Sequence, residues 1–190
     1  MTRAGVRVRS FYLLPIVLVL GGWLLLRPRP PALSDRDQAS VQRAALLTLF
    51  ESREHAKQLV FWNDGANLSP ALQLLRESGV SVEAQQPDTA TLALPMPVHL
   101  ETLATLEQQF RARPDGWESW FARFPASSGL VALTRPVVLG SNAVGIERAT
   151  VVVARTCGEH CHSAWRVTVV RDAGHAWRTR AVEPLKLPRD

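Results

Sequence analysis

The sequence predicts an α+β fold behind an N-terminal transmembrane helix, with helices packed on a C-terminal antiparallel β-meander. Two observations predict the domain. Apolar residues recur at helical spacing in several segments before residue 125, and they alternate with polar residues from Leu130 onward. A third observation predicts the membrane helix, because residues 11–26 pass without a charge. A sequence in which predicted helices come first and predicted strands follow is typical of the α+β class.

Residues 11–26, FYLLPIVLVLGGWLLL, predict a transmembrane signal anchor. Residues 1–10 are a basic n-region with three arginines, and no acidic residue precedes Asp35. A membrane-spanning helix takes about 17–25 apolar residues, and flanking arginines and tryptophan cover a small shortfall. No small-x-small cleavage site follows this run, so we expect an anchor that is retained rather than a cleaved signal peptide.

The charge distribution predicts the orientation of the chain. Three arginines and the amino terminus precede the anchor, whereas only Arg27 and Arg29 follow it closely, which predicts a cytoplasmic N-terminus in a bacterial inner membrane. Residues 27–34 then form a proline-rich spacer, and residues 35–190 form a periplasmic domain. The membrane is thus one expected partner, and another envelope protein is a second.

The net charge of +5 comes wholly from the first thirty residues, which hold five arginines and no acid. The whole chain has 22 basic and 17 acidic residues, and residues 31–190 hold 17 basic and 17 acidic residues. A formally neutral domain lacks the basic excess that neutralises phosphates, so nucleic acid is not an expected partner.

Helices and short strands are expected between the spacer and residue 125. Ser34 or Asp35 caps a helix to about residue 54, and Ser69-Pro70 starts a second helix that Gly79 ends. Short strands are expected at residues 59–62, 80–83 and 89–94. Another helix is expected from about His99, with an apolar face of Leu100, Leu103, Leu106 and Phe110.

An aromatic helix is expected after Gly116, ending at Pro125. Its large side chains fall at positions i, i+3, i+4 and i+7, namely Trp117, Trp120, Phe121 and Phe124. Such a face usually packs in a core, and the alternative is a platform for a ligand. Trp117 and Trp120, together with Trp165 from a later strand, are the candidate interaction residues.

The C-terminal part predicts four successive strands at residues 130–135, 146–155, 164–171 and 176–182. Cys157–His162, with the sequence CGEHCH, connects the second strand to the third. In an oxidising compartment, Cys157 and Cys161 are expected to form a disulfide that closes a tight loop. The alternative is a metal site built from Cys157, His160, Cys161, His162 and His175, although structural zinc sites normally use separated ligand pairs.

Other catalytic signatures are weak in this sequence. No G-x-S-x-G elbow, P-loop, dinucleotide-binding fingerprint or H-E-x-x-H motif occurs, and the cysteine spacing differs from the C-x-x-C-H of haem attachment. We therefore expect no catalytic residues and no cofactor.

Residues 116–130, GWESWFARFPASSGL, followed by CGEHC at 157–161, resemble a family of uncharacterised bacterial membrane-anchored or periplasmic proteins. That family carries a G-W-x-x-F/W…P-x-S-x-G segment and a C-G-x-x-C loop, and this chain departs from it at His162, which replaces a glycine. The resemblance implies a shared fold and an extracytoplasmic setting, and it brings no established activity.

Two functions follow as hypotheses. The first is a membrane-tethered periplasmic domain that acts as a non-enzymatic binding or interaction module of the envelope. The second is a small envelope enzyme or metal-binding protein that uses the Cys157–His162 loop. Free thiols or bound metal in the purified protein would favour the second hypothesis.

Overall fold

The structure, a computed structural model, describes residues 33–51, 57–62, 69–111, 116–141, 147–171 and 176–188. In these residues the chain forms five helices and a mixed eight-stranded sheet, which confirms the α+β class. The helices are α2 (Asp35–Phe50), α3 (Pro70–Glu77), α4 (Thr89–Leu92), α5 (Leu103–Arg111) and α6 (Gly116–Arg123). The strands are β1 (Gln58–Trp62), β2 (Ala84–Gln85), β3 (Val98–Glu101), β4 (Ser127–Thr134), β5 (Val137–Ser141), β6 (Glu147–Gly158), β7 (Cys161–Arg171) and β8 (Arg178–Leu185).

The predicted basic region and anchor lie outside the described residues, as does the spacer up to residue 32. No helix in the described part of the chain combines the length and the apolar character needed to cross a membrane. The described residues belong to one compact unit, Ala32–Asp190.

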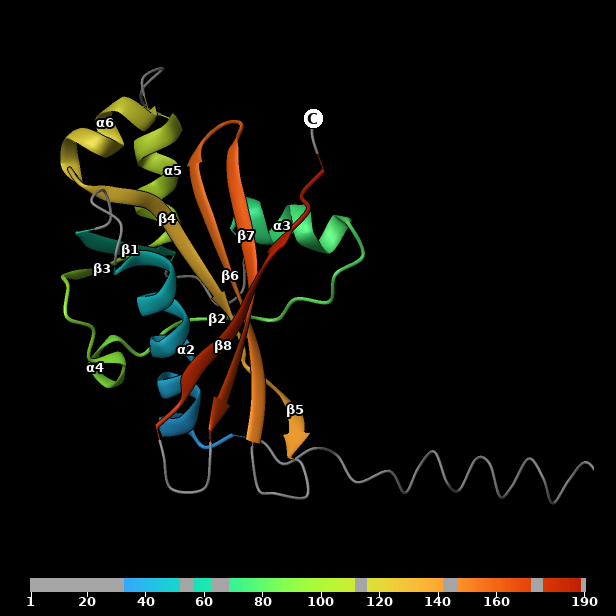
Figure 1. The fold of residues 1–190 in the computed structure, drawn as a ribbon. Coiled ribbons are helices and arrows are strands. Elements are labelled where there is room, and N and C mark those ends of the chain that lie inside the picture. Colours follow the sequence, from blue (N-terminus) through green and yellow to red (C-terminus); the bar gives the residue numbers. More distant parts are fainter. Residues whose placement is uncertain are drawn as a thin grey trace, which may run out of the picture. The chain divides into compact units, whose positions relative to one another are not determined.

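The sheet has the strand order β3-β1-β4-β6-β7-β8 (Figure 1). Strands β6, β7 and β8 form the predicted antiparallel meander, and β4 pairs antiparallel with β6. The prediction of an antiparallel meander alone was incomplete, because β1 pairs parallel with both β3 and β4. Parallel neighbours require crossover connections, and α3, α5 and α6 lie in those connections.

Helices cover both faces of the sheet. Successive side chains of a strand point to opposite faces, so Val131 and Leu133 of β4 join the core beneath α2, whereas Ala132 joins the core beneath α3. Val60 and Leu130 face α5 and α6 in a third, aromatic cluster. This aromatic cluster lies on the same face as α3 and positions the candidate site described below.

Local capping explains where the helices begin. The Ser34 hydroxyl accepts a hydrogen bond from the Asp37 backbone N–H at the start of α2, as predicted. Ser69 is the N-cap of α3 and Pro70 takes its first position, while Gly79 follows its end at φ 81°. Helix α2 ends at Phe50, short of the predicted residue 54.

Three local predictions were wrong. Residues 89–92 form helix α4 rather than a strand, because the Asp88 carboxylate caps the Ala90 N–H at 3.1 Å. Residues 98–101 form strand β3 rather than the start of a helix, because they pair with β1. Residues 80–83 are not a strand, and the two-residue β2 follows them.

An ion-pair network fixes the first turn of α2 to the sheet. The Arg171 guanidinium donates to the Asp37 carboxylate, and its Nε donates to Glu147 Oε2 at 2.9 Å. The Trp177 indole N–H also donates to Asp37, at 3.1 Å. Partial burial raises the pKa of Asp37, but hydrogen bonds from Trp177 and Ser34 and the charge of Arg171 outweigh it, so the pKa lies below its usual value.

We expect Asp37→Asn to lower the free energy of unfolding at neutral pH by about 1–2 kcal/mol, since a charged acceptor of several hydrogen bonds is lost. Because the pKa of Asp37 is lower in the folded than in the unfolded state, the ionised carboxylate stabilises the fold above about pH 4. This stabilisation is lost as the pH falls through the folded-state pKa. Urea unfolding of the full chain in mild detergent should therefore show the difference at pH 7 and its progressive decrease as the pH falls below about 4. Asp35→Asn is the matched control, because it removes a charge from the same first turn outside this network.

Candidate functional site

The cysteine loop lies at the tip of the β6–β7 hairpin. Cys157 and Cys161 form the predicted disulfide, with a Cα–Cα distance of 5.0 Å. The His162 ring connects two parts of the loop by hydrogen bonds. Its Nε2 lies 2.8 Å from the Glu159 carbonyl oxygen, and its Nδ1 lies 3.4 Å from Thr156 Oγ1. These partners fit a ring that carries its proton on Nε2 and accepts at Nδ1.

The loop packs directly against β4 at Gly129. This glycine has φ 103°, a left-handed conformation that side chains disfavour. A Cβ at this position would lie 2.9 Å from the Cys157 Cα and would clash with the Thr156 carbonyl oxygen. The close approach of the two backbones therefore requires glycine, and it fixes where the loop lies relative to the sheet.

Helix α6 contributes an aromatic cluster beside the loop. Trp120 is fully buried, and its ring centroid lies 4.7 Å from that of Phe124 and 6.1 Å from that of Phe110. Trp117 is half-buried and lies 4.9 Å from Phe110. Of the two candidate residues on this helix, Trp120 thus packs in the core, while Trp117 reaches the surface.

Trp117 and the cysteine loop line the same cavity, of about 490 Å³, which we call the aromatic pocket. Its described lining comes from β1, α3, α5, α6, β4, β6 and β7 and from Glu159 in the loop between the last two strands. The apolar lining residues are Trp62, Pro70, Leu103, Leu106, Phe110, Trp117 and Leu130, and the others are Glu107, Thr156, Gly158, Glu159 and His162. Its volume falls in the range of small-molecule sites, about 300–1,000 Å³.

The polar groups of the aromatic pocket are few. Trp62 lines the pocket, but its Nε1 is buried without a hydrogen-bond partner among the described residues and has almost no surface that a ligand could contact. Glu107 and Glu159 supply carboxylates, and no lysine or arginine is present among the described lining residues.

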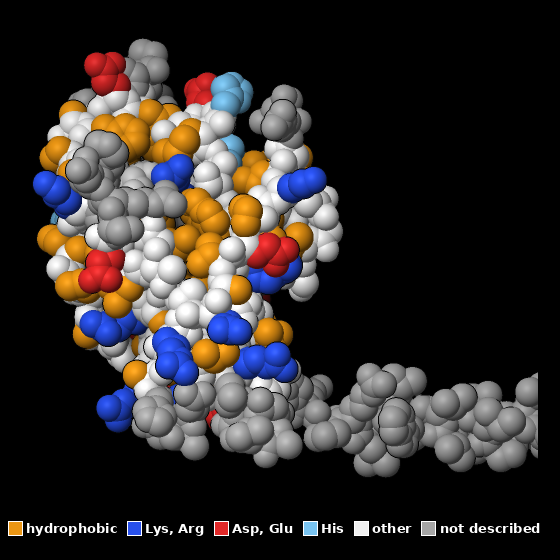
Figure 2. Space-filling view, viewed as in Figure 1, with side chains coloured by type: hydrophobic (Ala, Val, Ile, Leu, Met, Phe, Trp, Pro, Cys, Tyr) orange, Lys and Arg blue, Asp and Glu red, His pale blue; other side chains and the backbone are white. Residues whose placement is uncertain are grey.

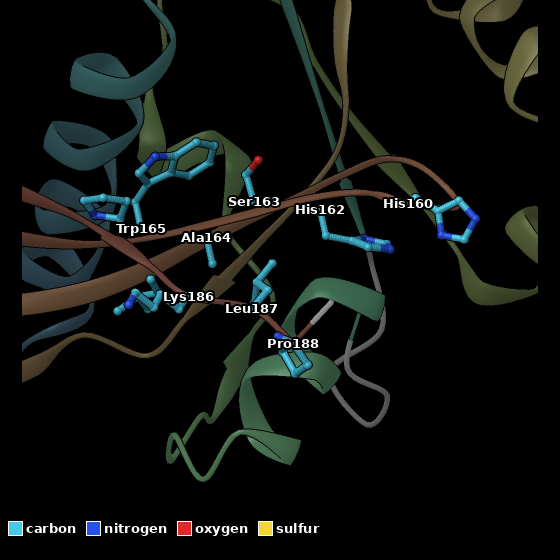
Figure 3. Close-up of a pocket in the computed structure, with 10 residues that line it drawn as sticks. His160, His162, Ser163, Ala164, Trp165, Lys186, Leu187 and Pro188 are labelled. Carbon is cyan, nitrogen blue, oxygen red and sulfur yellow. The ribbon is translucent and has the colours of Figure 1, made fainter. Parts of the chain in front are cut away.

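A second cavity, the edge notch, opens between β7 and the C-terminal segment (Figures 2 and 3). It measures about 770 Å³ and exists because pairing of β7 with β8 stops at Ala164 and Leu185. In Figure 3, Ser163 and Trp165 point to one side of β7 and Ala164 points to the other. The notch is more polar than the aromatic pocket, with His160, His162, Ser163 and Lys186 in its lining.

Trp165, the third candidate interaction residue, lines the edge notch rather than the aromatic pocket. Its ring packs edge-on against Phe50 of α2, with centroids 6.4 Å apart. The structure therefore brings Trp117 together with the cysteine loop and places Trp165 on the other face of the sheet.

The alternative metal set is only partly described. Both sulfur atoms of Cys157 and Cys161 are in the disulfide, and His160 and His162 lie on the same loop. His175 lies outside the described residues. Within the described ranges, no three His, Cys, Asp or Glu side chains gather in a way that could hold a metal ion.

Comparisons with protein-family models, curated proteins and solved structures find no match for this chain. The resemblance to envelope proteins therefore stays a prediction.

Sequence reasoning missed several residues of the aromatic pocket. The pattern around Trp62 predicts only the end of a strand, and the apolar stripe of Leu103, Leu106 and Phe110 predicts only a helix face. The available signal was the number of large apolar residues in short helices, which exceeds what one side of a small core can bury. Glu159 gave no signal of its own apart from its place in the loop.

Proposed function

We propose that this chain is a membrane-tethered periplasmic binding domain of the bacterial envelope, without enzymatic activity, and that it holds a small ligand in the aromatic pocket. The observation that carries the proposal is the pocket itself. A largely apolar cavity of about 490 Å³ with a few polar groups in its lining is the usual form of a small-molecule site.

The proposed location is supported by the sequence and by the cysteine pair. Residues 11–26, with flanking arginines and tryptophan to cover the small shortfall in length, support a membrane anchor, and the arginines before them favour a cytoplasmic N-terminus. The Cys157–Cys161 disulfide fits an oxidising compartment, where such bonds persist.

Binding is better supported than catalysis at this site. His162, the one histidine among the described lining residues, has a protein partner at each ring nitrogen, so neither nitrogen is directed at a ligand. The disulfide likewise removes both thiols as nucleophiles or metal ligands. What the pocket offers a ligand is apolar, largely aromatic surface, with the exposed Glu159 in its lining.

The test is a titration of the full chain in phosphatidylcholine nanodiscs with tyrosol, a neutral phenol-alcohol. The protein is labelled with 5-fluorotryptophan, and each ¹⁹F resonance is assigned by a Trp→Phe variant. We expect the Trp117 resonance to shift saturably, whereas that of Trp165, which lies outside the pocket, stays unchanged.

Two matched variants test the location of binding. Leu103→Trp places a larger ring in the pocket lining and should weaken tyrosol binding about tenfold or more through steric exclusion. Leu100→Trp adds the same ring at an exposed position of β3 outside the lining and should bind as the parent chain does. Absence of saturable binding to the folded parent, or equal binding by both variants, would contradict the proposal.

A further inference from the structure

The edge notch lies where strand β7 loses one of its two neighbours. On the β6 side, pairing of β7 continues to Cys161, whereas on the β8 side it stops at Ala164 and Leu185. Among the described residues, the β7 main chain before Ala164 therefore has a paired strand on one side only. Figure 3 shows His162 of β7 and Leu187 of the C-terminal segment on facing sides of the notch. An unpaired strand edge beside a cavity of about 770 Å³ is a place where a further strand can be added.

The C-terminal segment leaves the edge of β7 because its side chains pack elsewhere. Leu185 and Leu187 pack against the apolar cluster beneath α3, to which Ala164 of β7 also belongs. This packing takes the chain after Leu185 toward α3 instead of along β7. The position that a longer β8 would occupy beside His162 is thus left without a strand in the described part of the chain.

The alternation along β7 determines which main-chain groups face the notch. In antiparallel pairing, the N–H and C=O of one residue point to one neighbouring strand, and those of the next residue point to the other. Trp165 lies opposite Pro184, which has no N–H to donate, so the main-chain groups of Trp165 are assigned to β6. The two-residue turn at the hairpin tip closes on the pair of Gly158 and Cys161, which assigns Cys161 to β6 as well. The N–H and C=O of His162 therefore point into the notch.

The side chains of the notch indicate the chemistry of an added strand. The half-buried Trp165 ring offers apolar surface on the α2 side of the sheet, and Leu187 offers it on the α3 side. Lys186 is exposed, and the described lining contains no aspartate or glutamate. A peptide with aliphatic side chains and acidic residues therefore complements the notch better than a basic peptide does.

We propose that the edge notch binds an extended, acidic peptide segment of another envelope protein, which adds to β7 as an antiparallel strand. One peptide residue exchanges N–H···O=C hydrogen bonds with the main chain of His162, and a neighbouring aliphatic residue covers the Trp165 ring. The notch and the aromatic pocket share only His162 in their described linings. The inference therefore goes beyond the proposed function and does not depend on a ligand in the aromatic pocket.

The experiment titrates the full chain, labelled with 5-fluorotryptophan in phosphatidylcholine nanodiscs, with the acidic peptide acetyl-Glu-Val-Thr-Val-Glu-amide. We expect the Trp165 resonance to shift saturably and that of Trp117 to stay unchanged, the reverse of the result expected with tyrosol. The basic peptide acetyl-Lys-Val-Thr-Val-Lys-amide should bind about fivefold more weakly, because one exposed lysine contributes modestly. Absence of saturable binding of the acidic peptide to the folded chain would overturn the inference and leave the proposed function standing.

N-methylation of the acidic peptide tests the main-chain pairing. One analogue is methylated at its odd-numbered residues and the other at its even-numbered residues. Because only alternate residues of an added strand direct their N–H groups at β7, one analogue should bind about tenfold more weakly or worse, and the other should bind as the parent peptide does. Equal binding by the two analogues would overturn strand addition.

Matched variants assign binding to the notch. Pro188→Trp places a ring in the lining and should weaken binding of the acidic peptide about tenfold or more, whereas Val182→Trp, at an exposed position of β8 outside the lining, should not. Lys186→Glu should reverse the preference between the two peptides, whereas Arg180→Glu, exposed on β8 outside the lining, should preserve it. Equal binding by the two tryptophan variants would overturn the location, and an unchanged preference in Lys186→Glu would overturn the acidic character of the partner.

Discussion

Replacing Trp120 by alanine is expected to lower the free energy of unfolding by about 3–5 kcal/mol, one of the largest effects available in this fold. Trp120 is fully buried, and its ring contacts Phe110, Trp117 and Phe124. Removal of the ring leaves a cavity between α6 and the sheet. The surrounding side chains would have to repack to fill this cavity. Urea unfolding of the full chain in mild detergent, followed by circular dichroism, measures the loss.

Two further variants separate the causes of that loss. Trp120 Nε1 has no hydrogen-bond partner among the described residues, so Trp120→Phe removes volume without breaking a hydrogen bond and should cost clearly less than alanine. Trp117→Ala removes a half-buried ring of the same helix and should cost less still, while weakening tyrosol binding. An equal loss of stability in Trp117→Ala and Trp120→Ala would contradict the distinction between a core ring and a pocket ring.

The elements with a strong local period were predictable from the sequence. The aromatic helix after Gly116 and the strands of the C-terminal meander appear close to where alternation and helical spacing place them. Residues 98–101 and 89–92 were not predictable in this way. Residues 98–101 form a strand only because they pair with β1. Residues 89–92 form a helical turn because Asp88 caps it.

The candidate site was predictable only in parts. Trp117 and the Cys157–His162 loop each stood out in the sequence, but their meeting depends on β4 pairing with β6, a contact between distant segments. Trp62 joins them because β1 pairs with the other side of β4. The order of the strands in the sheet depends on many packing contacts between distant segments. No short sequence motif could therefore predict that these three segments would line one cavity.

Gly129→Ala is expected to destabilise the fold by about 4 kcal/mol, from two causes that add at one position. An alanine at φ 103° is strained by about 1–3 kcal/mol. Its Cβ would also clash with the Thr156 carbonyl oxygen, and overpacking of this kind costs about 1–3 kcal/mol more. The same urea unfolding assay measures the total.

Gly140→Ala separates the two causes. Gly140 lies in β5 at φ 111°, close to the angle of Gly129, but a Cβ added there would meet nothing within 4 Å, so only the backbone strain applies. The difference between the two variants therefore measures the contact between β4 and the hairpin tip. Because relief of the clash must displace Thr156 and Cys157, Gly129→Ala should also move the cysteine loop and weaken tyrosol binding in the aromatic pocket, which Gly140→Ala should preserve. Equal stability losses, with tyrosol binding intact in both variants, would show that the close approach at Gly129 does not position the cysteine loop in the aromatic pocket.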